Sequence, residues 1–133
     1  MADQADPTTI VSVAVTVDDV VTALETNRRT DRRVVLRITP PFSARMRARL
    51  HRPEGGADDA VHLDPERLVD DPPSYPHPDE TRDADGTYAP ERHHERHTAA
   101  VRAWRRAVGE SVADAVDLRS GAGGHRVEIK PLG

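Results

Sequence analysis

The sequence predicts a single α+β domain of about five mostly antiparallel strands, with two helices packed on one face of the sheet. Three observations favour this class: short β-branched runs near the N-terminus, one long helix-periodic segment, and two alternating runs near the C-terminus. A chain of 133 residues has the length of one domain and can bury most of its apolar surface. We assign residues 9–133 to this domain and expect residues 1–8 to form a disordered tail.

The first third of the chain predicts a strand, a helix and a second strand. The β-branched run IVSVAV at 10–15 is typical of a strand buried on both faces. Thr16 is placed to cap a helix that runs from Val17 to about Arg29, with Asp19 completing a capping box. The second strand spans residues 32–39 and ends before Pro40-Pro41, because proline cannot donate to a sheet ladder.

The segment at 43–52, SARMRARLHR, alternates strictly between apolar and basic residues. That period favours a half-buried edge strand, hairpinned onto residues 32–39. A helix is the alternative, because Phe42, Met46 and Leu50 follow one another at intervals of four residues. In the strand, Arg45, Arg47 and Arg49 lie on one face within about 14 Å.

The chain becomes irregular after Pro53. A short extended piece at 61–63 precedes a helical turn that Asp64 caps. Residues 70–89 then form a proline- and aspartate-rich arm, which cannot bury enough apolar surface to fold by itself. The arm is either mobile or held to the domain by Tyr75 and Tyr88.

The last third predicts the main helix and a hairpin. Pro90 suits the first position of a helix that extends to Ala113. Its apolar stripe is formed at helical spacing by Val101, Trp104, Val108 and Val112. The alternating runs at 116–120 and 125–130 then form a hairpin, with GAGG as the turn.

The amino-acid composition indicates where in the cell the protein works. The chain has no cysteine, no apolar run of the roughly 20 residues that a membrane span needs, and a polar N-terminus unlike a signal peptide. We expect a soluble cytoplasmic protein. Arginine outnumbers lysine 18 to 1 and aspartate exceeds glutamate 15 to 8, which suits high internal salt. This pattern favours a salt-loving archaeon, with a GC-rich actinobacterium as the alternative.

Two stretches carry a family resemblance. At TPPFSARMRARLH (39–51) and YAPERHHERH (88–97), the chain resembles an uncharacterised family of small proteins from halophilic archaea. The resemblance runs through most of the chain and is interrupted in the acidic middle. It implies a lineage and a domain of unknown function, and it provides no catalytic residue.

Positive charge is concentrated in one segment. Between Glu25 and Arg52 there are nine arginines against two acids, a local balance of +7 that leaves −11 for the rest of the chain. Guanidinium groups match phosphates bidentately, so these residues point to a non-enzymatic module that binds nucleic acid or an acidic protein. The candidate binding residues are Arg37, Arg45, Arg47 and Arg49. Alternatively, the acidic arm folds back over these arginines.

A histidine cluster at the start of the main helix gives a second hypothesis. His93 and His97 are one turn apart and could share a divalent metal with His94. A further ligand would come from elsewhere, such as His62, His77 or His125, and the HExxH protease signature is absent. A metal-binding protein or small enzyme is therefore one alternative. In another, one or two of these histidines only cap the apolar stripe, and the rest face solvent. A third hypothesis is a structural subunit of a complex, whose arm docks on a partner.

Overall fold

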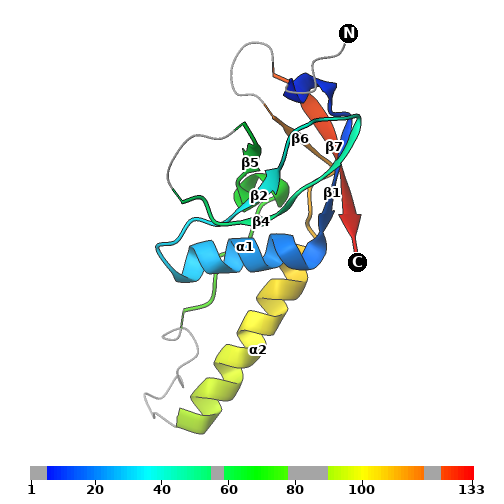
Figure 1. The fold of residues 1–133 in the computed structure, drawn as a ribbon. Coiled ribbons are helices and arrows are strands. Elements are labelled where there is room, and N and C mark those ends of the chain that lie inside the picture. Colours follow the sequence, from blue (N-terminus) through cyan, green and yellow to red (C-terminus); the bar gives the residue numbers. More distant parts are fainter. Residues whose placement is uncertain (1–5, 55–58, 78–89, 119–123) are drawn as a thin grey trace.

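The computed structural model describes residues 6–54, 59–77, 90–118 and 124–133 (Figure 1). Within these ranges the chain forms two α-helices and seven strands, which confirms the α+β class. In chain order the elements are η1 (Pro7–Thr9), β1 (Ser12–Thr16), α1 (Val17–Arg29), β2 (Val35–Ile38), β3 (Arg45–Arg47), β4 (Arg49–His51), β5 (Val61–Leu63), η2 (Pro65–Leu68), α2 (Pro90–Gly109), β6 (Ala115–Asp117) and β7 (Arg126–Leu132).

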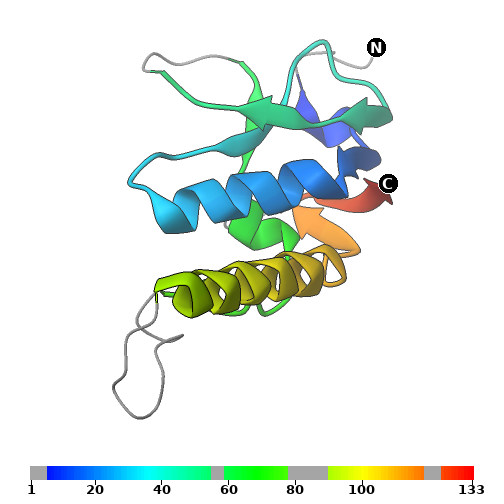
Figure 2. The same cartoon turned by 90° about the horizontal axis from the view of Figure 1, so that it is seen from below.

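The strands form two sheets. The larger sheet has the order β3-β1-β7-β6, with β1 parallel to both β3 and β7 and with β6 antiparallel to β7. The smaller sheet has the order β4-β2-β5 and is antiparallel throughout. Both helices lie on the same side of the strands, and the C-terminal end of α2 meets α1 while the rest of α2 runs away from it (Figures 1 and 2).

The segment at 43–52 is a strand region, but it is not the single hairpin strand that its alternation predicts. Only β4 pairs with β2, whereas β3 pairs in parallel with β1 in the other sheet. The chain crosses between the sheets at Ala48, which is fully buried and donates its N–H to the carbonyl of Ala14 at 3.0 Å. A small side chain at this crossing fits between the two sheets, and local periodicity does not reveal the change of partner.

The core lies between the sheets and the helices. Strand β1 contributes Val13 and Val15, and α1 packs Val20 and Leu24 against them. Thr16 begins α1 as predicted, because its Oγ1 accepts the N–H of Asp19 at 3.3 Å. Further buried residues come from both sheets and α2: Leu36, Ile38, Leu63, Trp104, Val108, Val116, Val127 and Ile129.

Several predicted boundaries differ in the structure; the second strand, for example, covers Val35–Ile38 rather than residues 32–39. Residues Pro7–Thr9 form a 3-10 turn capped by Asp6, so this part of the predicted tail has regular structure. Helix α2 ends at Gly109 rather than at Ala113, because Val112 instead forms a β-bridge with Val69. The predicted C-terminal hairpin is confirmed by the antiparallel pairing of β6 with β7, whereas most of its glycine turn lies outside the described residues.

The first part of the acidic arm is held against the helices. Trp104 donates its indole N–H to the carbonyl of Pro73 at 2.9 Å, and the ring of Tyr75 meets Trp104 edge-on at 5.0 Å between centroids. Tyr75 therefore anchors the arm to α2. Of the two alternatives for the arm, this contact agrees with the one in which Tyr75 holds it to the domain. Residues 78–89, which include Tyr88, lie outside the described part of the chain.

Candidate anion-binding site

The candidate arginines occupy two neighbouring sheet faces. Arg45 and Arg47 lie on β3, Arg49 lies on β4, and all three side chains are exposed. Arg37 lies on β2 directly opposite Arg49 and is half-buried. We call these four residues the arginine surface: Arg37, Arg45, Arg47 and Arg49.

Three arginines of this surface border one shallow hollow of about 290 Å³. Its lining within the described ranges contains no carboxylate and consists of Arg37, Thr39, Met46, Arg47, Arg49, Leu50 and His51. Arg37 and Arg49 are also a directly opposed cross-strand pair, an arrangement that is destabilising for like charges.

A second hollow adjoins the first, since Met46 lines both. It has a volume of about 680 Å³, and its floor includes the small residues Ser12 and Ala14 of β1. Arg45 and Lys130 stand at its border, and Lys130 pairs with Glu128 at 2.9 Å. Two adjoining hollows thus border the segment from Arg45 to Arg49, and each of them is lined in part by cationic side chains.

The arginines of the surface differ from neighbouring arginines in their pairing. Arg28 pairs with Glu66 at 3.4 Å, and Arg33 pairs with Asp64 at 3.2 Å. Among the residues that the structure describes, by contrast, no carboxylate lies within 4.0 Å of Arg45, Arg47 or Arg49. The alternative that the acidic arm covers these arginines concerns mainly residues 79–85, which fall outside the described ranges.

The histidine cluster does not assemble a metal site in the described part of the chain. His94 is exposed at the start of α2, while His93 and His97 are half-buried. No group of three or more potential ligands is close enough to hold a metal ion within the ranges described. Two of the proposed distant ligands are engaged elsewhere: the ring of His62 packs 5.4 Å from that of His51, and His125 Nε2 lies 2.6 Å from the carbonyl oxygen of Ile10.

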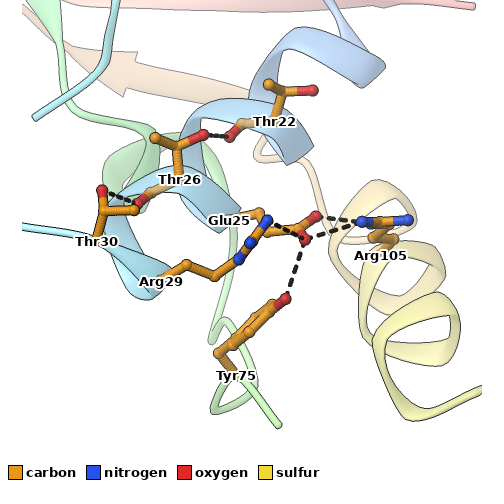
Figure 3. A network of polar contacts seen from close by, with 7 residues as sticks. All are labelled: Thr22, Glu25, Thr26, Arg29, Thr30, Tyr75 and Arg105. Carbon is orange, nitrogen blue, oxygen red and sulfur yellow. Dashed lines mark hydrogen bonds and ion pairs between the residues drawn. The ribbon is translucent and has the colours of Figure 1, made fainter. Parts of the chain in front are cut away.

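The structure also shows a polar network that the sequence patterns did not suggest (Figure 3). Glu25, on α1, is only 7 % exposed and accepts hydrogen bonds from Arg105 Nε at 2.6 Å and Nη2 at 2.9 Å. Tyr75 donates its hydroxyl to the same carboxylate at 3.0 Å, and Arg29 lies 3.9 Å away. One signal was available in the sequence, because Glu25 follows Val21 by one helical turn and so adjoins the apolar stripe of α1.

The network shifts the pKa values of its members. The hydrogen bonds from Arg105 lower the pKa of Glu25, and they outweigh the opposing effect of its burial. Burial raises the pKa of Tyr75, and the hydrogen bond to Glu25 raises it further. Glu25 is therefore a carboxylate and Tyr75 a neutral phenol near pH 7. Because both pKa values are shifted away from neutral pH, the pair is poorly suited to acid–base catalysis, and its contact attaches the arm to the helices.

None of the helices in the described ranges is long and apolar enough to cross a membrane.

Comparisons with known proteins give a family and no precedent for a function. No curated protein and no solved structure matches the chain. A family model described as "Domain of unknown function (DUF8009)" matches residues 1–133, so the chain belongs to this uncharacterised family.

Proposed function

We propose that this chain is a non-enzymatic binding module whose arginine surface binds the phosphates of a nucleic acid. The observation that carries the proposal is the contrast in pairing within one basic segment. Arg28 and Arg33 have carboxylate partners, whereas Arg45, Arg47 and Arg49 are exposed with none among the described residues. Exposed guanidinium groups without an internal partner are available to an external anion.

The shape of the site supports an extended partner. Two hollows adjoin each other at Met46; Arg45 lines one of them, and Arg47 and Arg49 line the other. A flexible polyanion can place successive charged groups in two such sites, and each contact releases condensed counterions. A single small anion would use only one hollow.

The composition of the surface favours phosphate contacts over base recognition. Stacking of bases on aromatic rings is a main source of affinity in single-strand binding proteins. Among the residues that the structure describes, no phenylalanine, tyrosine or tryptophan lines either hollow, and Phe42 is buried at 2 % exposure. We therefore expect binding that depends weakly on sequence and strongly on salt. An acidic protein is the other partner that this charge pattern could accept.

The test is a triple Arg→Gln variant at positions 45, 47 and 49, measured by fluorescence anisotropy with single- and double-stranded oligonucleotides over a salt series. Each lost phosphate contact should reduce the slope of log K against log salt by about 0.7 to 0.9. The matched control replaces Arg28, Arg33 and Arg52 by glutamine. Those three arginines lie in the same segment and have carboxylate partners within 3.2 to 3.8 Å, so the control removes the same charge.

Three results would count against the proposal. Equal losses in both triple variants would mean that net charge alone determines binding. Unchanged binding with a large loss of thermal stability would mean that the arginines have a structural role. Binding to a polyglutamate peptide without binding to either nucleic acid would assign the surface to an acidic protein.

We also propose that the protein belongs to a halophilic archaeon and acts in its cytoplasm. The support is compositional: a formal net charge of −4 with 18 arginines and one lysine suits a salt-rich cell interior. In such salt the counterion-release contribution is small. Bidentate geometry at the arginine surface would then supply much of the affinity.

A further inference from the structure

A crevice lies between α1 and α2, on a part of the molecule that the arginine surface does not include. Its volume is about 670 Å³, and it is lined by Val17, Asp18, Val21, Thr22, Glu25, Thr26, Arg29, Arg105, Arg106 and Gly109. We call it the helix crevice. These residues come from α1 and from the last turns of α2, and Figure 1 shows that this end of α2 meets α1.

The charges of the helix crevice are arranged with cations outside and a carboxylate inside. The side chains of Arg29 and Arg105 are 60 % and 50 % exposed, whereas that of Glu25 is 9 % exposed. Arg106 is exposed, and in the described chain it has no carboxylate within ion-pair distance. Asp18 is the second acid of the lining, about 16 Å from Arg29 along the axis of α1. An approaching ligand therefore meets guanidinium groups first at this end.

Glu25 and Tyr75 fix the position of one of these cations. The carboxylate binds the Nε and Nη2 atoms of Arg105, and the Tyr75 hydroxyl holds the carboxylate from the other side (Figure 3). Glu25 does not use Nη1, so this nitrogen stays available as a donor. A guanidinium held in place by a buried carboxylate loses less side-chain entropy when it binds an anion.

The other end of the helix crevice has apolar side chains next to one acid. Val17, Val21 and Gly109 lie there together with Asp18. A Cβ atom on Gly109 would lie 3.2 Å from Val17 Cγ1, so glycine lets the two helices approach closely at this point. The crevice thus combines an arginine-rich end with an end where two valines lie beside a single carboxylate.

We infer that the helix crevice is a second binding site, which takes a small organic phosphate or carboxylate that carries an apolar group. The anion contacts Arg29, Arg106 and the Nη1 atom of Arg105, while the apolar group rests on Val17 and Val21. The side chains of Thr22 and Thr26 border the space between the two ends. This site is independent of nucleic-acid binding at the arginine surface.

The experiment uses phenyl phosphate as the probe, with inorganic phosphate and phenol as its two halves. Binding to the full chain is followed by NMR through the backbone amides of Thr22, Arg106 and Gly109. We expect saturable binding of phenyl phosphate at these amides, and weaker binding of either half. Arg29→Gln and Arg106→Gln should each weaken phenyl phosphate binding by about tenfold, the effect of losing one charge-assisted hydrogen bond.

The control is Arg102→Gln, which removes the same charge from an exposed position on α2 that does not line the helix crevice. It should leave the affinity unchanged, and so should the triple variant at Arg45, Arg47 and Arg49. The inference is overturned if phenyl phosphate does not saturate these amides, or if inorganic phosphate binds equally well. It is also overturned if Arg102→Gln weakens binding as much as Arg106→Gln does.

Discussion

The Glu25 carboxylate on α1 holds the Arg105 guanidinium on α2 through two hydrogen bonds, of 2.6 and 2.9 Å. The two residues are far apart in the sequence, and their contact ties the two helices together. Tyr75 adds a third hydrogen bond and brings the start of the acidic arm to the same point. One buried carboxylate therefore joins three segments of the chain, and its replacement tests how the fold is held together.

We predict that Glu25→Gln lowers the free energy of unfolding by about 1–3 kcal/mol. The amide keeps the shape of the side chain but loses the charge that the two Arg105 donors require. The loss stays at the lower end of the range for buried pairs, because Arg105 is half-exposed and can recover water. Urea unfolding measures the effect, and Glu110→Gln is the matched control on an exposed glutamate. Equal stability of the two variants would contradict this role for Glu25.

We predict that the Glu25 carboxylate makes the free energy of unfolding depend on pH in the acidic range. The pKa of Glu25 is lower in the folded chain than its ordinary value of 4.5, so the unfolded chain binds this proton first as the pH falls. The contribution of Glu25 is therefore complete above about pH 5 and is lost as the pH falls through 4.5 towards the folded-state pKa. Urea unfolding between pH 6 and pH 3 should show a smaller loss of stability in Glu25→Gln than in the parent protein. Parallel curves for the two proteins would contradict the prediction.

We predict that Ala48 tolerates enlargement poorly. Ala48 is 0 % exposed at the point where the chain crosses between the two sheets, so added methylene groups would have to displace the core. Ala48→Leu should lower the free energy of unfolding by about 1–3 kcal/mol. Ala44→Leu, at an exposed position of the same alternating segment, should change it by less than about 0.5 kcal/mol. Similar thermal melting points for both variants would contradict the prediction, because they would mean that the core accommodates a leucine side chain at position 48.

The contrast between Ala44 and Ala48 also shows what the sequence could predict. Hydrophobic period correctly indicated the strand character of 43–52 and the exposure of Arg45, Arg47 and Arg49. It could not indicate that Ala48 divides the segment between two sheets, because strand partners are chosen by tertiary packing. A parallel neighbour such as β1 leaves no turn signal beside the segment.

The two proposed binding surfaces also differ in how far the sequence could predict them. The arginine surface was predicted from local alternation, and only Arg37 depends on a cross-strand register. The helix crevice joins residues of α1 to residues of α2, and no local pattern relates these positions. Glu25 stood out only as an acid beside an apolar stripe, and Arg105 only as one arginine of many on the polar side of α2. Their pairing becomes visible when the two helices are placed side by side.

We predict that the folded protein becomes more stable as potassium chloride is raised from 0.1 to 2 M. Acidic residues exceed basic ones by four over the chain, and the basic stretch at 25–52 leaves −11 on the remainder, so like charges crowd outside that stretch. Salt weakens this repulsion. It also weakens the exposed ion pairs, but each of these contributes only about 0–1 kcal/mol.

The shape of the salt response separates charge screening from a general strengthening of apolar burial. The Debye length falls from about 10 Å at 0.1 M to about 3 Å at 1 M, so screening is largely complete by 1 M. We therefore expect most of the rise in thermal midpoint below 1 M, with a smaller gradient above it. A rise that continues in proportion to salt beyond 1 M would point to apolar burial instead. A midpoint that is flat or falls over the whole range would contradict the proposed adaptation to high salt.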